Sequence, residues 1–256
     1  MDPIFGSDWP ADLAGRLGRP WVELDVVPET GSTNADLAAA ARDGAVSGTV
    51  LVAGHQVQGR GRLDRTWTAA PGASLAISVL LRPPSAIPQK RWTWLPLMTG
   101  LAVAEALVGS AGVQAELKWP NDVLIGGRKV CGILAERVGD AVVIGMGINT
   151  RLGEEELPVP TATSLRLAGA VIADPELVLA VLDRLGAWYL RWLAGADLGP
   201  ALAARCCTIG REVRMELPAA APVRGVAVGI DVDGRLLVRT GEVVRPFSAG
   251  DVVHLR

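Results

Sequence analysis

A glycine- and arginine-rich stretch carries the most chemical information in this sequence. Residues 56–67 place Arg60, Arg62 and Arg65 within six positions of one another. A loop of this kind can close over an anion, because backbone N–H groups and guanidinium groups both bind phosphate. A solvated basic loop, or a loop that touches RNA, would have the same composition. The segment therefore indicates an anion-binding loop and leaves those two alternatives open.

A second cluster of polar residues follows an expected strand at residues 115–119. Lys118, Asn121 and Asp122 bring a cation, an amide and a carboxylate to one strand–turn–strand junction. Lysine is a compact charge suited to phosphate, and aspartate is a ligand that Mg²⁺ accepts. An ordinary polar turn beside a core tryptophan is the alternative.

Two shorter motifs add candidates for binding a small polar ligand. Lys129 begins an expected strand, and Gly132 in that strand permits a close approach of other groups. A charge that guards the edge of a hairpin is the alternative at Lys129. Ser32 and Thr33 would offer hydroxyl groups to a polar head group, whether or not this segment also caps the helix that follows.

Several other chemistries are excluded. No phosphate-binding P-loop sequence occurs, and residues 145–149 lack the third glycine of a dinucleotide-binding motif. Cys131, Cys206 and Cys207 form neither a disulfide framework nor a zinc motif with the two histidines. Cys131 is interpreted as a small buried apolar residue. Reduced thiols of this kind favour a cytoplasmic location.

The composition is that of an ordinary globular protein. The 256 residues are 50% hydrophobic and carry a formal net charge of −2, which excludes a strongly basic nucleic-acid binder. Because the first twenty positions carry several charged residues, we expect no signal peptide, and the apolar stretch 95–108 is too short and too polar for an expected membrane span. Lysine and asparagine occur only three times each, so these positions stand out as places that require the particular side chain.

The hydrophobic pattern predicts an α+β protein with two domains. Strands are expected at 21–27, 49–53, 73–81, 115–119, 123–125, 130–137 and 141–148, and helices at 35–42, 89–108, 175–193 and 198–205. Short β-type runs at 212–217, 223–231, 235–239 and 243–247 predict a small barrel. We therefore expect a larger domain at residues 1–206 and a small β-barrel domain at residues 207–256.

Taken in order, these segments resemble biotin protein ligases, in the form without an N-terminal DNA-binding domain. The matching pieces are residues 31–34, 59–62 with Arg65 and Trp67, 118–122, Lys129 with 132–136, 147–149, 229–231 and 248–252. Each motif alone is unspecific, whereas the ordered set is specific and covers nearly the whole chain from Trp21. The resemblance implies a mixed-sheet catalytic domain of the class II synthetase type with flanking helices, followed by an SH3-like barrel.

The resemblance also implies the reaction. Biotin and ATP, with Mg²⁺, would give biotinyl-5′-AMP and pyrophosphate, with no tightly bound organic cofactor. The biotinyl group would then pass to one lysine of a biotin carboxyl carrier domain of an acyl-CoA carboxylase. No enzyme nucleophile is needed, because the carboxylate of biotin itself attacks. Catalysis would then depend on positioning and charge stabilisation.

Residue roles follow from the same resemblance. The biotin site would consist of Ser32, Thr33, Asn34, Gln56, Gly59, Arg60, Gly61, Arg62, Trp67, Lys129, Gly132 and Ile133. Of these, Ser32, Thr33 and Gln56 would face the ureido ring, with help from the backbone of residues 60–62. The nucleotide site would consist of Arg62, Arg65, Asn121, Lys129 and Asn149, with Asn149 toward the adenine. The catalytic groups would be Lys129, Arg62, Arg65, Lys118 and Asp122, with Mg²⁺ near Asp122.

Two other functions stay open at this point. A lipoate ligase shares the fold and the adenylation chemistry, although the arginine-rich loop and the 118–122 motif favour biotin. A nucleic-acid-binding module is disfavoured, because residues 198–256 hold eight arginines against six acidic residues and the single aromatic Phe247. About twenty residues precede the first expected strand, too few for a helix-turn-helix module, so we expect neither specific DNA binding nor membrane association.

Overall fold

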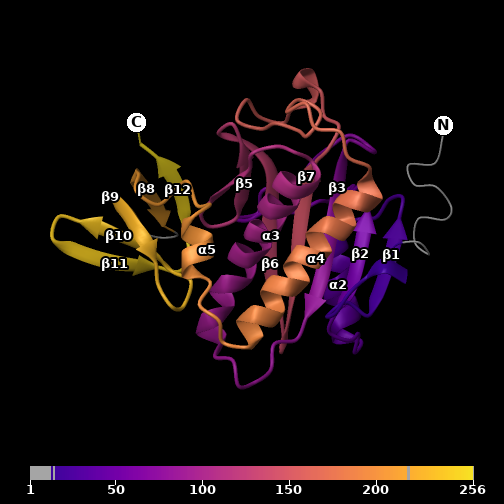
Figure 1. Cartoon of the computed structure of the whole chain (residues 1–256), viewed down its shortest axis with the longest axis horizontal. Coiled ribbons are helices and arrows are strands. Elements are labelled where there is room, and N and C mark those ends of the chain that lie inside the picture. Colours follow the sequence, from indigo (N-terminus) through magenta and orange to yellow (C-terminus); the bar gives the residue numbers. More distant parts are fainter. Residues whose placement is uncertain (1–12, 14, 218–219, 256) are drawn as a thin grey trace.

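A mixed β-sheet lies at the centre of the molecule (Figure 1). The structure, a computed structural model, describes residues 13, 15–217 and 220–255. Within these residues the first sheet has seven strands in the order β1-β2-β3-β7-β6-β5-β4, with only β1 and β2 parallel. The strands are β1 (Glu23–Val27), β2 (Thr49–Ala53), β3 (Ser74–Leu81), β4 (Glu116–Lys118), β5 (Asp122–Ile125), β6 (Arg128–Val138) and β7 (Ala141–Asn149).

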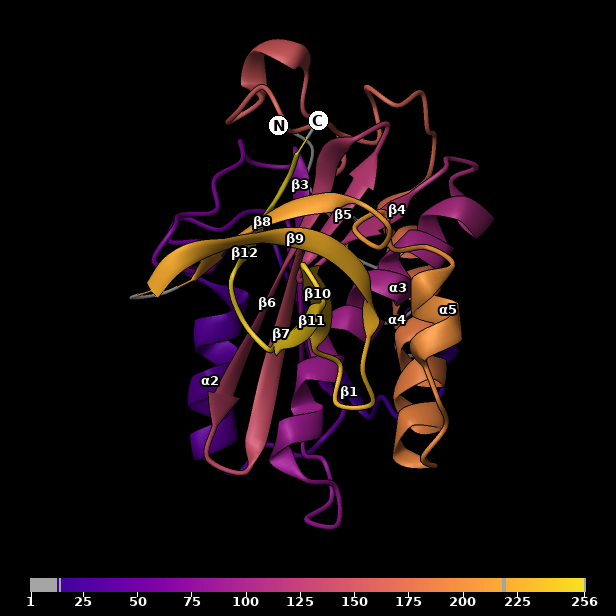
Figure 2. The same ribbon diagram turned by 90° about the vertical axis from the view of Figure 1, so that its left-hand side faces the viewer.

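Helices cover both faces of this sheet (Figure 2). α2 (Thr33–Arg42) packs on one face, and Ser32 caps it by accepting a hydrogen bond from the Ala35 N–H. α3 (Trp94–Ser110) and α4 (Asp174–Leu193) pack on each other and on the opposite face. The other helical segments whose bounds lie within the described residues are η1 (Gln89–Thr93), η2 (Glu154–Glu156) and α5 (Gly199–Ala203).

The two faces of the sheet carry different side chains, and this difference makes room for a site. Every second residue of β3 and β7, such as Ile77 and Ile144, is buried in the main core with α3 and α4. The alternate residues of β7 face α2, and Val143 packs against that helix. Gly145 and Gly147 continue the same row. Because glycine has no side chain, the sheet carries no side chains of its own at these two positions, beside the N-terminus of α2.

The stretch Gln89–Ser110 is the one helical segment among the described residues that is long and apolar enough to cross a membrane, by length and composition alone. Most of it is buried inside the fold, and Leu95, Leu101 and Leu107 are almost fully enclosed by the main core. It is the central helix of the packed protein.

A second sheet follows near the C-terminus. Its strands pair antiparallel in the order β11-β10-β9-β8-β12 within the described residues. They are β8 (Glu212–Leu217), β9 (Ala220–Ile230), β10 (Leu236–Thr240), β11 (Val243–Phe247) and β12 (Asp251–His254). Buried side chains of this sheet, such as Met215 and Val252, join the main core cluster, so the two sheets share one apolar interior.

The connection between the sheets lies near Cys207. The Leu117 N–H on β4 donates to Arg205 O, and the Cys207 N–H donates to Leu117 O, so the chain still follows the first sheet there. The Gly210 N–H then donates to Ala227 O in the second sheet, at 2.7 Å. Because the hydrogen bonds change from the first sheet to the second near Cys207, we propose residues 1–206 and 207–256 as the two domains.

Hydrogen bonds also tie the small domain to the larger one. The Trp94 indole N–H at the start of α3 donates to Val232 O at 3.0 Å, and Lys90 pairs with Asp233 at 3.3 Å. Thr208 Oγ1 lies 3.0 Å from His254 Nε2 on β12 and accepts a hydrogen bond from the Trp119 N–H of the larger domain at 3.1 Å. Through Thr208, β12 is linked to the first sheet.

His254 gives the folding stability a pH dependence. Burial, together with the positive charges of Lys118 and Arg211, lowers the pKa of His254 to about 4. An unfolded chain protonates this imidazole near pH 6.5, whereas the folded chain protonates it only near pH 4. The stabilisation of the folded state by neutral His254 is therefore fully present above pH 6.5. It is lost as the pH falls from 6.5 towards 4.

We expect this loss in chemical denaturation experiments at pH 7 and pH 5. The free energy of unfolding of the wild type should fall more than that of His254→Gln, by about 1 kcal/mol after allowance for solvent screening. Equal losses in the two proteins would show that His254 does not control the effect.

Candidate active site

One cavity of about 560 Å³ collects almost all the side chains that the sequence singles out. Its walls come from the start of α2, the arginine-rich loop, β5, β6, β7 and β12. The expected residues that line it are Ser32, Thr33, Asn34, Gln56, Arg60, Gly61, Arg62, Arg65, Trp67, Lys118, Asn121, Asp122, Lys129, Gly132, Ile133 and Asn149. Gly59 lines a neighbouring groove instead, where a Cβ would lie only 2.4 Å from Trp67 O.

The floor of the cavity is a pair of opposed glycines. Gly132 on β6 and Gly147 on β7 face each other in the antiparallel register. A Cβ on Gly147 would lie 2.4 Å from the Trp67 ring, and a Cβ on Gly132 would lie 3.0 Å from it. The indole therefore rests directly on the backbone of two strands, which requires glycine at both positions.

Gly147→Ala is expected to push the Trp67 ring off the sheet and to displace the arginine-rich loop. The KM values for biotin and ATP, the substrates expected from the sequence, should rise about tenfold or more, since small misplacements of catalytic groups are costly. Gly229→Ala on β9 is the matched control, because no atom lies within 4 Å of its Cβ position. Steady-state kinetics that are equal for the two variants would contradict this role of the glycine floor.

A β-bulge turns Lys129 towards the cavity. The ladder between β5 and β6 contains one extra residue, Val130, between Lys129 and Cys131. In a regular strand Lys129 and Gly132 would lie on opposite faces, because they are three residues apart. The bulge places both on the cavity face, where a Cβ on Gly132 would lie 2.9 Å from the lysine Nζ.

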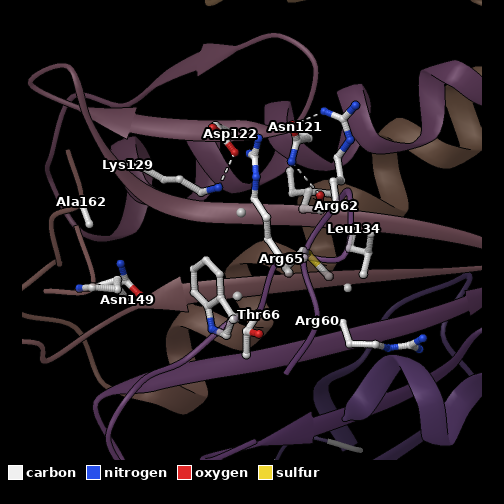
Figure 3. A pocket seen from close by; sticks show the side chains of 18 of the residues that line it. Arg60, Arg62, Arg65, Thr66, Asn121, Asp122, Lys129, Leu134, Asn149 and Ala162 are labelled. Carbon is white, nitrogen blue, oxygen red and sulfur yellow. Dashed lines mark hydrogen bonds and ion pairs between the residues drawn. The ribbon is translucent and has the colours of Figure 1, made fainter. Parts of the chain in front are cut away.

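Lys129 is paired with a carboxylate at the middle of the site. Its Nζ lies 2.6 Å from Asp122 Oδ1 and 5.9 Å from the centroid of a Trp67 ring. Figure 3 shows the ammonium and the carboxylate facing each other. The two side chains keep 33% and 22% of their surface exposed, so a ligand in the cavity can reach both.

The small domain holds two arginines of the loop over the cavity. Arg62 donates to Asn121 Oδ1 at 2.8 Å and to Gly250 O at 3.1 Å, and its Nη1 lies 3.4 Å from Asp251 Oδ1. Arg65 pairs with the other oxygen of the same carboxylate. Burial lowers the pKa of Arg62, and the neighbouring carboxylates oppose this shift. The two guanidinium groups thus converge on one anionic group.

A buried polar network lies at the start of α2. The Thr33 N–H donates to Gln56 Oε1 at 2.8 Å, and Thr33 Oγ1 lies 3.0 Å from the same oxygen. Ser78 Oγ lies 2.7 Å from both Thr33 Oγ1 and Asn34 Oδ1. Asn34 Nδ2 donates to Glu136 Oε2 at 2.7 Å. This end of the cavity is therefore rich in uncharged hydrogen-bonding groups.

Asn149 organises the opposite wall. Its Nδ2 donates to Thr163 O at 2.9 Å, and the Thr163 N–H donates to Lys129 O at 2.8 Å. The Lys129 N–H donates to Thr161 O at 2.7 Å, so residues 161–163 run beside the first residues of β6. The Asn149 Oδ1 has no partner among the described residues and is available to a ligand in the cavity.

The carboxylates of the site determine how it could bind a metal ion. The described residues contain no group of three or more His, Cys, Asp or Glu side chains that could hold a metal ion alone. A Mg²⁺ ion that arrives with ATP keeps water and phosphate ligands and needs only one or two carboxylates, which Asp122 fits.

Burial raises the pKa of Cys131 to about 12, which makes it an inert thiol.

Three members of the site escape sequence reasoning. Asp251 lies in a motif that indicates only the end of the barrel, yet it meets the arginine-rich loop. Glu136 pairs with Arg60 at 3.2 Å from the far end of the same expected strand as Lys129. Ser78 is a hydroxyl in an otherwise apolar strand, and that contrast is the one signal that could have found it.

Comparisons with known proteins agree on one family. Residues 30–149 match the biotin/lipoate A/B protein ligase family, and residues 208–255 match the biotin protein ligase C terminal domain. The biotin--[acetyl-CoA-carboxylase] ligase of Mycobacterium tuberculosis is 44% identical over 93% of this chain and 91% of its own length. The ligase of the same name from Paracoccus denitrificans is 33% identical over 84% of this chain and 93% of its own length.

A solved structure gives the same result. The biotin protein ligase from Aquifex aeolicus in complex with biotin and ATP has a TM-score of 0.78 and 30% identity, covering 92% of this chain and 100% of that one. Fold and site together define the class of biotin/lipoate A/B protein ligases. Within that class, the chain belongs to the biotin protein ligases.

Proposed function

We propose that the cavity is where this biotin protein ligase makes and holds biotinyl-5′-AMP. The enzyme joins biotin to ATP, releases pyrophosphate and transfers the biotinyl group to the carrier of acetyl-CoA carboxylase. One observation carries the assignment to the cavity: a single ammonium group lies between its two ends, where the two substrates would react. Asn149 and Ala162 lie at one end, Arg60 and Leu134 at the other, and the Lys129 ammonium lies between them (Figure 3).

The uncharged end suits the biotin rings. A ureido group has two N–H donors and one oxygen acceptor, and Ser32, Thr33 and Gln56 offer both kinds of partner. Trp67 forms an apolar wall for the thioether ring and the aliphatic tail. Ile133 lines the cavity from β6, but its side chain lies in the main core beside Gly100 of α3. The biotin carboxylate then points toward Lys129.

The middle of the cavity suits the reacting groups. A biotin carboxylate oxygen attacks the α-phosphorus of ATP, and the bond from this phosphorus to the bridging oxygen of pyrophosphate breaks. Lys129 balances the negative charge at the α-phosphate, and Arg62 and Arg65 bind the pyrophosphate as it leaves. Asn149 Oδ1 accepts a hydrogen bond from the amino group of adenine. Transfer follows when a neutral lysine amine of the carrier attacks the acyl carbon and AMP leaves.

Mg²⁺ completes this proposal. Asp122 would hold the ion together with phosphate oxygens, and Lys118 adds a positive charge beside the same phosphates. The ion supplies neutralisation of the triphosphate charge when bound. Asp122 also orients the Lys129 ammonium through their ion pair.

The acceptor class and setting are also proposals. The 44% identity to a biotin--[acetyl-CoA-carboxylase] ligase supports a biotin carboxyl carrier domain of acyl-CoA carboxylases as the acceptor. We propose that the enzyme works in the cytoplasm, without specific DNA binding and without membrane association.

Biotin attachment to a carrier domain tests the proposal. The purified chain, Mg²⁺-ATP, biotin and an isolated carrier domain are combined, and the carrier is weighed intact by mass spectrometry. We expect one added biotinyl group, and none on a carrier whose acceptor lysine is replaced by arginine. An unmodified carrier together with a normal yield of adenylate would contradict the acceptor class, whereas no adenylate would contradict the site.

A further inference from the structure

We propose that Ser78 and Asn34 set the selectivity of the biotin end by making the Thr33 hydroxyl a hydrogen-bond acceptor for a ligand N–H group. The inference rests on the proposed placement of the ureido ring beside Thr33. Ser78 is fully buried on β3 and is not part of the cavity wall, so it acts through Thr33 as a positioning residue. Whether the Thr33 hydroxyl accepts or donates towards a ligand depends on where the hydroxyl protons of this network lie.

The orientation of the Asn34 amide is fixed by two acceptors. Its Nδ2 lies 2.7 Å from Glu136 Oε2 and 3.2 Å from Leu134 O. Glu136 is also paired with Arg60 at 3.2 Å, so its carboxylate oxygens accept and do not donate. A flipped amide would place an oxygen against both acceptors. The Asn34 Oδ1 must therefore face Ser78, and it brings no proton to that contact.

The orientation of the Gln56 amide is fixed in the same way. The Thr33 backbone N–H lies 2.8 Å from Gln56 Oε1 and requires an acceptor there. A flipped amide would place its own N–H donors against this backbone N–H. Gln56 Oε1 therefore also brings no proton to its contact with the Thr33 hydroxyl.

Three oxygen–oxygen contacts now compete for two hydroxyl protons. Ser78 Oγ lies 2.7 Å from Asn34 Oδ1 and 2.7 Å from Thr33 Oγ1, whereas Thr33 Oγ1 lies 3.0 Å from Gln56 Oε1. The two short contacts are at the usual length of an O–H···O hydrogen bond. Ser78 thus donates to Asn34, and the Thr33 hydroxyl donates to Ser78. The longest contact is left without a proton.

The result is a pair of acceptors that lacks a donor. Thr33 Oγ1 and Gln56 Oε1 meet at 3.0 Å, and both residues line the cavity. A ligand N–H placed against them supplies the missing hydrogen bond, and a ligand without one leaves a buried acceptor unpaired. A ureido ring provides such an N–H and a dithiolane ring does not. The network therefore selects biotin over lipoate.

A double-mutant cycle on biotin binding tests the inference. Biotin is titrated calorimetrically, without ATP, into the wild type, Ser78→Ala, Thr33→Val and the double variant. We expect Ser78→Ala to raise the Kd about tenfold, as for the loss of a hydrogen bond, and Thr33→Val to raise it by at least as much. The double variant should match Thr33→Val within about twofold, because Ser78 acts through the hydroxyl that Thr33→Val removes.

Two controls separate this role from general stability. Thr99→Val removes another buried hydroxyl, which donates to Leu95 O on α3, and should leave the biotin Kd unchanged. Ser78→Ala should leave the KM for ATP unchanged. Ser78→Cys keeps a weak donor and replaces the alanine variant in the same cycle if that variant does not fold.

Each result has one reading. Additive effects in the double variant, or a Ser78→Ala Kd within twofold of the wild type, would overturn the inference. Absence of biotin binding by the wild type would overturn the proposed site instead. Equal affinities of Thr33→Val and the double variant, with a weaker Ser78→Ala, are the expected result.

Discussion

Lys129→Ala is expected to slow formation of biotinyl-5′-AMP by about 10²–10³-fold in a single turnover. The lysine lies between the two ends of the cavity, and its charge opposes the negative charge that grows at the α-phosphate. The Kd for biotin should change by less than about tenfold, because the ureido ring binds elsewhere. Rapid-quench measurement of the adenylate, beside calorimetric titration of biotin, separates the two effects.

Arg128→Ala is the matched control for this prediction. Arg128 precedes Lys129 on β6, but it pairs with Glu154 at 3.1 Å and is not part of the cavity wall. Its adenylation rate should stay within about twofold of the wild type, as for an ordinary surface substitution. Near-normal single-turnover adenylation by Lys129→Ala would refute the assignment of the reacting centre.

Arg62→Gly is expected to release the adenylate into solution. The guanidinium joins the loop to Asn121, to Gly250 O and to the Asp251 carboxylate, so its loss removes every one of these links at once. Dissociation of preformed biotinyl-5′-AMP should accelerate by about 10²-fold or more, since the loop then no longer covers the ligand. Rapid filtration after a chase with unlabelled biotin measures this rate.

The control for Arg62→Gly keeps the charge and changes the flexibility. Leu63 lies in the same loop with a φ of 54°, a conformation that glycine adopts easily, and the residue is 56% exposed. Leu63→Gly should retain the adenylate within about threefold of the wild type, because all contacts of the guanidinium remain. Equal release by both variants would assign retention to loop stiffness alone.

Much of the fold follows from local sequence signals. Thr49–Ala53, Glu212–Leu217 and Val243–Phe247 form strands at the boundaries that the hydrophobic pattern predicts. The Gly126-Gly127 turn has positive φ values of 56° and 78°, as a two-residue hairpin requires. Such features depend on neighbouring residues, so a sequence reveals them directly.

Contacts between segments that are distant in the sequence cannot be predicted from local sequence signals. β12 has only four residues and pairs with β8, some forty positions earlier, so no local periodicity reveals it. The contact of Asp251 with Arg62 depends on how the small domain docks. The bulge at Val130, which turns Lys129 into the cavity, depends on the register with β5.

The candidate site shows the same division. Rare side chains such as Lys129 and Asn149 stand out from an arginine- and alanine-rich background, and the structure brings them to one cavity. Ser78 carries no motif, because its importance comes from the Thr33 and Asn34 side chains that it contacts across the fold.

Pyrophosphate release by the purified chain tests the central claim most directly. Mg²⁺-ATP is supplied with biotin in one reaction and with lipoate in a parallel one, and a third reaction contains neither acid. We expect release that depends on biotin and no release above background with lipoate. Release with lipoate alone, or the same background rate in all three reactions, would contradict the assignment of this cavity to biotin activation.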